Sequence, residues 1–228
     1  MRTFGSPSAK IRAVGVKPPT RRKQDQMFRP YALEIGKFAL EWNRLHENLY
    51  LLFSAALGEG ENMLLAYKVW HSLQSDRAQR EMLRAAAQVT FATDAQKRAY
   101  PKALNDTIWL LDRTQSLANR RNDALHSPFI LSFSESTYSV QPDVFFGHPR
   151  ASSFEGKNVL VQIKCYRDHA IILHRFAYKL FYCLKVDALM KGLAQPHPWP
   201  ERPKLRQLAS STSHNRNPRT CRSTTSVK

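Results

Sequence analysis

Apolar residues recur every three or four positions over most of the chain, which is the spacing that one face of an α-helix requires. The first such stripe follows Pro30 and stops at Gly58, and it predicts one long helix. Its apolar members are Phe38, Trp42, Leu45, Leu49, Phe53 and Ala56.

Three further helices are predicted before residue 128. A second apolar stretch covers 63–73, and a third helix begins at the capping pair Ser75-Asp76. The pair Thr93-Asp94 begins a fourth helix, whose stripe continues to Leu125. This helix should end near His126, because the residue that precedes a proline, here Pro128, is disfavoured in the helical conformation.

Residues 129–167 have a different pattern. Three short segments in this region, 129–131, 137–140 and 158–163, are rich in β-branched and aromatic residues and are separated by proline and glycine. They predict a small antiparallel hairpin or meander. The helical period resumes at Asp168. The predicted fold is therefore mainly α, a helical bundle of about five helices with a small β-hairpin or meander before the last helix.

The charge of the chain is concentrated at its ends. The net charge is +17, of which residues 1–30 and 191–228 carry +7 each and residues 31–190 only +3. The ends are also poor in core-forming residues, which predicts a disordered basic arm at 1–29, a folded helical domain at 30–190 and a disordered basic tail at 191–228. The ends can attract polyanions such as RNA or serve as inert solubilising tails, and residues 1–24 have the composition of an organellar transit peptide.

Several classes of protein are disfavoured by what the sequence lacks. The longest nearly uncharged apolar stretch, 49–57, is about half of the ~20 residues that a membrane-spanning helix requires, and no secretory signal is evident. The three cysteines are far apart and form no metal-binding pair, and no glycine-rich nucleotide-binding loop is present. We expect a cytoplasmic protein without a membrane partner, metal or other cofactor.

The segment 119–129 carries the residues best suited to chemistry. It contains Arg121 and His126 near the end of the fourth predicted helix. Imidazole titrates near neutrality and can transfer protons, while a guanidinium group is permanently charged and has forked donors suited to phosphate. RNA carries its own nucleophile, the 2′-hydroxyl. Cleavage therefore requires only proton transfer and stabilisation of negative charge on the phosphate, which a histidine and an arginine can supply.

The six residues 121–126, RNDALH, resemble the Arg-Asn-x-x-x-His motif of the HEPN superfamily of small α-helical domains. The bundle and the late position of the motif agree in outline. The resemblance implies a metal-independent endoribonuclease of the toxin or defence kind, with Arg121 and His126 as catalytic residues. Asn122 would bind phosphate or orient the imidazole, Asp123 would assist, and Arg120 would contact the substrate. A regulatory protein such as an antitoxin is a further possible partner.

The spacing of Arg121 and His126 raises a geometric problem. Five residues correspond to about 140° around a helix, so an intact helix presents the two side chains on partly different sides. They can meet at one phosphate if the helix frays at His126, if the side chains reach far enough, or if a second subunit contributes its own pair. In HEPN enzymes a second subunit usually contributes its own pair, so the resemblance implies a homodimer.

An alternative interpretation needs no catalysis. A histidine at the end of a helix often caps free carbonyl groups, and Arg120 and Arg121 can form a solvated face paired with Asp123. The chain would then be a non-catalytic HEPN-like interaction or scaffold module that binds nucleic acid through its basic ends.

Overall fold

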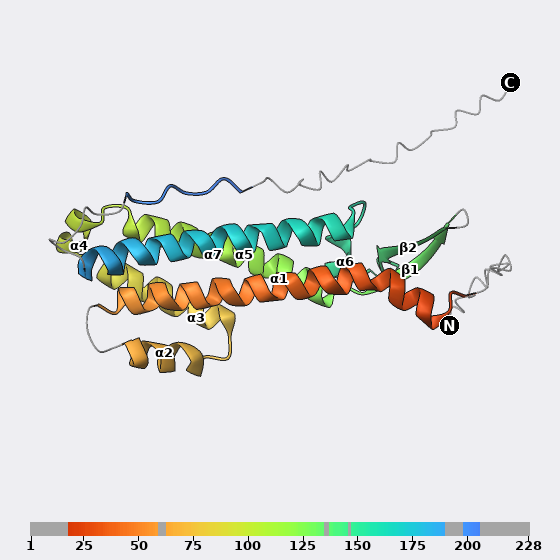
Figure 1. The fold of residues 1–228 in the computed structure, drawn as a ribbon, viewed down its shortest axis with the longest axis horizontal. Coiled ribbons are helices and arrows are strands. Elements are labelled where there is room, and N and C mark those ends of the chain that lie inside the picture. Colours follow the sequence, from red (N-terminus) through yellow and green to blue (C-terminus); the bar gives the residue numbers. More distant parts are fainter. Residues whose placement is uncertain (1–17, 59–62, 135–136, 146, 190–197, 206–228) are drawn as a thin grey trace, which may run out of the picture.

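The computed structural model describes residues 18–58, 63–134, 137–145, 147–189 and 198–205. Seven helices and one two-stranded sheet are formed by these residues (Figure 1). The elements in chain order are α1 (Arg21–Ala56), α2 (Met63–Ser72), α3 (Asp76–Thr90), α4 (Asp94–Ala99), α5 (Ala103–His126), β1 (Phe129–Ser134), β2 (Thr137–Pro142), α6 (Pro149–Ser152) and α7 (Val159–Leu189).

Four long helices, α1, α3, α5 and α7, make an elongated bundle (Figure 1). α1 and α7 run parallel, as shown by the ion pair of Glu34 with Arg167 and, further along both helices, the hydrogen bond from Asn48 to the carbonyl of His174. α5 runs antiparallel to its neighbours α3 and α7. The shorter helix α2 lies outside the bundle against α1.

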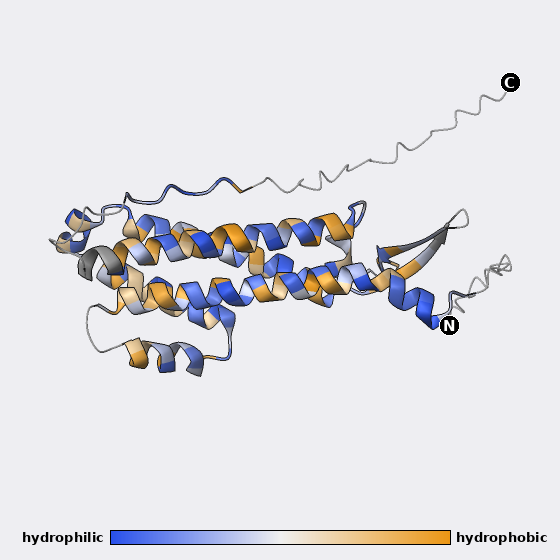
Figure 2. Cartoon of the chain, viewed as in Figure 1, coloured by the Kyte–Doolittle hydropathy of each residue, from blue (hydrophilic) through white to orange (hydrophobic). Residues whose placement is uncertain are grey.

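The core of the bundle lies between the four long helices, which contribute most of one cluster of buried side chains. Hydrophobic and hydrophilic residues alternate along these helices (Figure 2). Trp42, Phe38 and Leu45 of α1, and Leu173 of α7, are almost completely buried. Each fully buried side chain of this size stabilises the fold by about 1.5–3 kcal/mol. The apolar stripe predicted for the first helix therefore packs in the core of the bundle.

The mainly helical class and the hairpin before the last helix are confirmed. β1 and β2 pair antiparallel, with Phe129 opposite Pro142 and Ser132 opposite Ser139. The fourth predicted helix is two helices, because Pro101 lies between α4 and α5. This division raises the number of helices without changing the long stripe on α5.

The predicted third β segment, 158–163, is wrong. Asn158 accepts a hydrogen bond from the backbone amide of Val161 at 3.0 Å, and α7 begins at Val159. Val159 and Ile163 are buried at helical spacing with Tyr166 and the residues that follow. Packing against α1 and α5 therefore outweighs the β propensity of this short β-branched run.

The predicted arm at 1–29 is too long at its inner end. Residues 21–29 are helical, because α1 begins at Arg21 and runs through Pro30; the side chain of Thr20 caps it by accepting a hydrogen bond from the amide of Lys23 at 3.4 Å. This end of α1 is strongly hydrophilic (Figure 2). The rest of the predicted arm, residues 1–17, lies outside the described residues.

The predicted tail at 191–228 also contains an ordered segment. Residues 198–205, which we call the strap, have no helix or strand but are fixed on the bundle (Figure 1). Trp199 and Arg202 both bond to the carboxylate of Asp106, at 2.7 and 2.5 Å. These side-chain contacts hold the proline-rich strap in place without the backbone hydrogen bonds of a β-sheet. Residues 190–197 and 206–228 lie outside the described part of the tail.

Candidate active site

The RNDALH segment forms the last turns of α5. The helix remains intact through His126, and the amide of Ser127 closes it by donating to the carbonyl of Asp123 at 2.9 Å. Ser127 itself is extended, as expected before Pro128. The angle of about 140° between Arg121 and His126 therefore holds in the folded chain, and the helix does not fray to bring them together.

Arg121 points toward α1 and the start of α3. Its guanidinium carbon lies 5.6 Å from the centre of the Trp42 ring, and Nη1 lies 3.5 Å from Oδ2 of Asp76. The same Asp76 oxygen accepts a hydrogen bond from the indole nitrogen of Trp42 at 3.0 Å. Because the indole fixes the carboxylate and the carboxylate faces the guanidinium, the three groups orient one another.

Arg121 has donor capacity left. Nη1 also lies 3.5 Å from the side-chain oxygen of Asn122, at the limit of a hydrogen bond. Nε is buried and has no hydrogen-bond partner among the described residues. The side chain is 31% exposed, so a phosphate can approach it from solvent.

Arg80 lies against the other residues that surround Trp42. Its guanidinium carbon is 5.9 Å from the centre of the indole, and its side chain is only 4% exposed. Nη2 donates to Gln115 at 2.8 Å, and Nη1 lies 3.5 Å from Nε2 of His46. Together, Trp42, His46, Asp76, Arg80 and Arg121 form what we call the Trp42 cluster.

The electrostatics of the Trp42 cluster are dominated by burial. Burial lowers the pKa of His46 to about 4, and the neighbouring Arg80 and Arg121 add to the decrease, while Asp76 opposes it. Burial also lowers the pKa of Arg80. His46 is therefore neutral at pH 7, and Asp76 is the carboxylate that balances the two arginines.

His126 lies apart from the Trp42 cluster. It is exposed at the end of α5, and its ring makes no hydrogen bond or ion pair within the part of the chain that the structure describes. An incoming ligand can therefore reach this side chain from solvent. One copy of the chain therefore presents Arg121 and His126 as separate groups and does not bring them together.

The other predicted site residues have different surroundings. The guanidinium of Arg120 lies over the ring of Tyr166 on α7, with its carbon 5.7 Å from the ring centre. Asp123 is half-buried and contributes its charge near Tyr166, whose pKa is raised mainly by burial. The alternative prediction, in which Asp123 pairs with the two arginines, is wrong for Arg121, whose ion pair is with Asp76.

The Trp42 cluster contains residues that the sequence did not single out as a site. The sequence pattern predicts Trp42 only as a core residue and Asp76 only as part of a capping pair. The available signal was on α3, where Gln79 and Arg80 occupy positions that face the core together with Leu83. Polar side chains within an apolar stripe indicate a buried polar contact, although not its partner.

The described residues contain neither a cluster of metal-binding side chains nor a helix suited to the membrane. Within the described ranges, no three or more His, Cys, Asp and Glu side chains come together as a metal site would require. None of the described helices combines the length and apolar character needed to cross a membrane.

No family model, no curated protein and no solved structure matches the chain. The HEPN resemblance therefore rests on the six residues of the RNDALH segment and on the helical bundle.

Proposed function

We propose that this protein is a metal-independent endoribonuclease of the HEPN type. The observation that carries the proposal is the arrangement at the end of α5. An exposed His126, which has no hydrogen-bond or ion-pair partner among the described residues, lies about 1.4 turns from Arg121, whose guanidinium is oriented by Trp42 and Asp76. These two residues supply the chemistry that cleavage of RNA requires.

The reaction uses the 2′-hydroxyl of the RNA as nucleophile. His126 removes its proton or protonates the leaving 5′-oxygen, while Arg121 binds the phosphate and compensates the charge that develops on it. The products are a 2′,3′-cyclic phosphate and a 5′-hydroxyl. The ion pair of Arg121 with Asp76, at 3.5 Å, is longer than a strong hydrogen bond, so a phosphate can share the guanidinium with the carboxylate.

A second copy of the chain completes the proposed site. Because α5 is intact and Arg121 is directed toward α1 and α3, the Arg121 and His126 side chains of one chain do not meet at one phosphate. Two α5 helices related by a two-fold axis would place the histidine of one chain near the arginine of the other. The active species in this proposal is a homodimer.

A non-catalytic interaction module is the second candidate. It is favoured by the contacts of Arg121, because an arginine bound to an aspartate and stacked on a buried tryptophan has a sufficient structural role. In this case Arg121 stabilises the bundle and His126 is an ordinary surface residue.

Variants at the two positions separate the candidates. In the presence of EDTA we expect the wild-type protein to cleave RNA and His126→Ala to lose about 10²–10⁴-fold in rate, since it removes the proton-transfer group. Arg121→Ala should lose a comparable factor, and Arg121→Lys should recover little, because lysine lacks the planar fork. His71→Ala, which changes a histidine on α2, is the matched control and should remain active.

The products provide an independent check. Cleaved RNA should carry cyclic phosphate and 5′-hydroxyl ends, and a deoxyribose at the cleavage position should block the reaction. Intact RNA after incubation with the wild-type protein, or full activity of His126→Ala, would favour the non-catalytic module. Unfolding measurements on Arg121→Ala show whether its loss of activity follows from loss of structure.

A further inference from the structure

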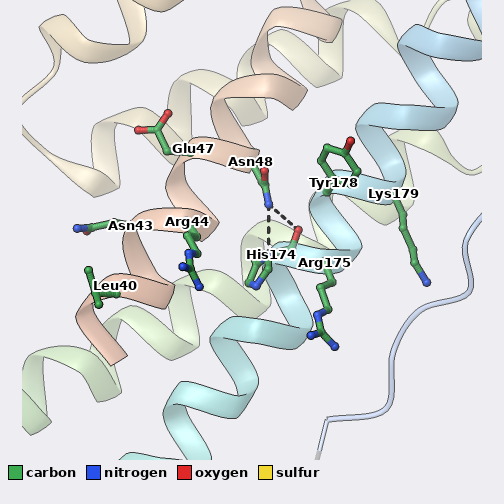
Figure 3. Close-up of a pocket in the computed structure, with 9 residues that line it drawn as sticks. All are labelled: Leu40, Asn43, Arg44, Glu47, Asn48, His174, Arg175, Tyr178 and Lys179. Atoms are coloured by element: carbon green, nitrogen blue, oxygen red, sulfur yellow. Dashed lines mark hydrogen bonds between the residues drawn. The ribbon is translucent and has the colours of Figure 1, made fainter. Parts of the chain in front are cut away.

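The parallel helices α1 and α7 enclose a groove of about 630 Å³ on their outer side (Figure 3). Leu40 and Arg44 line it from α1, and Arg175, Tyr178 and Lys179 line it from α7. Its volume lies within the range of ligand sites. None of these residues belongs to the Trp42 cluster or to the RNDALH segment.

The groove opens away from the proposed active site. Phe176 of α7 packs edge-on against Trp109 of α5, with ring centres 5.4 Å apart. Tyr178 follows two residues later, about 200° around the helix, and so faces away from α5. A ligand in this groove would not touch His126 of the same chain.

The exposed face of α7 at the groove alternates cations and aromatic rings. Arg175, Tyr178, Lys179 and Tyr182 are spaced as i, i+3, i+4 and i+7, which places all four on one side of the helix. Tyr178 is 49% exposed, and its ring centre lies 6.4 Å from that of Tyr182. A second cavity, of about 530 Å³, continues past Tyr182 to Trp199 of the strap.

The free positive charge lies on the α7 side of the groove. Arg175 and Lys179 are exposed and make no ion pair with any other described residue, whereas Arg44 is paired with Glu41 at 2.5 Å. On the α1 wall, Glu47 would repel an anion. An anionic ligand is therefore expected to lie against α7.

His174, at the floor of the groove, adds no positive charge at neutral pH. Burial lowers its pKa, and the nearby Arg175 and Arg44 lower it further, against the effect of Glu41. The side-chain amide of Asn48 donates to the backbone carbonyl of His174 at 2.9 Å (Figure 3). These contacts fix the floor and leave the rim to bind the ligand.

We propose that this face of α7 binds single-stranded RNA, with phosphates on Arg175 and Lys179 and bases stacked on Tyr178 and Tyr182. Aromatic rings beside cations are the combination that binds single strands without sequence preference. An acidic protein partner would use the cations equally well, but it would leave the exposed ring of Tyr178 without the flat partner that a base provides. The site goes beyond the proposed ribonuclease function, because binding here requires no cleavage.

The test measures binding of a 2′-O-methyl oligonucleotide to the full chain. This RNA lacks the 2′-hydroxyl nucleophile, so affinity is measured independently of any cleavage. We expect the double variant Arg175→Gln/Lys179→Gln to bind at least ~5-fold more weakly and to show a shallower dependence on salt. The matched control, Arg77→Gln/Lys97→Gln, removes the same charge from α3 and α4 and should bind more tightly than the groove variant.

Substitutions at Tyr178 distinguish stacking from simple apolar contact. Tyr178→Phe keeps a flat ring and should bind RNA as the wild type does. Tyr178→Leu keeps apolar area only and should weaken binding by ~5-fold or more, since a base stacks on a flat aromatic ring and not on a branched aliphatic side chain. With a 5-iodouridine oligonucleotide, photochemical crosslinks should map to Tyr178 or Tyr182.

The proposal is overturned if the groove variant and the charge-matched control bind RNA equally. It is also overturned if an oligo-glutamate peptide, but not RNA, depends on Arg175 and Tyr178, because the groove would then belong to an acidic protein partner. Neither result depends on whether His126 is catalytic, so failure of this proposal and failure of the ribonuclease proposal can be distinguished.

Discussion

Among the described Arg and Lys residues, Arg80 alone is buried. It has no carboxylate in hydrogen-bond contact; its partners are the amide of Gln115, the ring of His46 and the face of Trp42. A buried cation is costly unless surrounding groups compensate it, and Asp76 provides the nearby opposite charge. The Arg80 side chain therefore stabilises the bundle through its packing against Trp42 as well as through its charge.

Truncating Arg80 should destabilise the bundle strongly. Arg80→Ala removes a buried side chain and its hydrogen bond to Gln115, and we expect the free energy of unfolding to fall by about 2–4 kcal/mol. Arg80→Met, which retains much of the volume without the charge, should lose less. Urea unfolding measures both, with the exposed Arg77→Ala expected to change the free energy by less than about 0.5 kcal/mol. Equal losses for Arg80→Ala and Arg77→Ala would contradict the burial of Arg80.

His46 should make stability depend on pH. Its pKa in the folded state is about 4, below the ordinary value of 6.5, so the unfolded chain binds the proton more readily. The stabilisation is complete above pH 6.5 and is lost as pH falls toward 4, with a size of up to about 3 kcal/mol at about 1.4 kcal/mol per pKa unit. Urea unfolding of the wild type and of His46→Gln between pH 7 and pH 4.5 measures it.

In that comparison the variant should lose less stability on acidification than the wild type. His174 and the carboxylates titrate in both proteins, so the difference between the two slopes isolates His46. Parallel slopes would show that the ring of His46 accepts its proton in the folded state without cost.

At the scale of elements, the strap is attached to α5 through a single buried carboxylate. Asp106 accepts from the indole of Trp199 and from Nε of Arg202, and the guanidinium of Arg202 also lies over the ring of Trp109. Tyr100, before α5, lies beside Trp199, with ring centres 6.2 Å apart. One acidic residue therefore holds two side chains of an otherwise irregular segment, and aromatic contacts surround this anchor.

Asp106→Asn should release the strap. The amide keeps one acceptor but loses the negative charge that holds Arg202, and a hydrogen bond to a charged group contributes about 1.5–3 kcal/mol. We expect faster cleavage after Glu201 by a glutamyl endopeptidase, while Asp112→Asn, at an exposed position of the same helix, should be cleaved at the wild-type rate. An unchanged rate in Asp106→Asn would show that the prolines and aromatic contacts suffice.

At the scale of the whole molecule, the bundle separates two surfaces. The end of α5 carries the exposed His126 and, on a partly different side, Arg121, while the outer groove of α1 and α7 presents cations and aromatic rings elsewhere on the molecule. The proposed functions of both surfaces involve RNA, but only the first requires a second chain. Assembly is therefore the property that distinguishes the catalytic proposal.

Mixing two inactive variants tests the composite site. If the histidine of one chain acts with the arginine of the other, a heterodimer of His126→Ala and Arg121→Ala chains retains one of each group and should recover part of the cleavage activity. Each variant alone should stay inactive, and light scattering of the wild type at micromolar concentration should show a dimer. An active monomer, or no recovery in the presence of confirmed heterodimers, would contradict the two-fold site.

The long helices and their buried faces follow from the amino-acid sequence alone over most of their length. The stripe containing Phe38 and Trp42 is visible at a spacing of three and four residues, and Pro128 marks the end of α5, because both signals are local consequences of helix geometry. The same local rules failed at 158–163, where β-branched residues form the start of α7. Burial against two other helices decided that segment.

The surroundings of Arg121 and His126 depend on contacts between distant parts of the chain. The contacts of Arg121 with Trp42 and Asp76 join residues that are 79 and 45 positions apart in the chain, and the contact of Arg202 with Asp106 spans 96. Local periodicity carries no information about which helices become neighbours. The pairing depends on how four apolar stripes share one core, and it determines that Arg121 faces a buried cluster while His126 faces solvent.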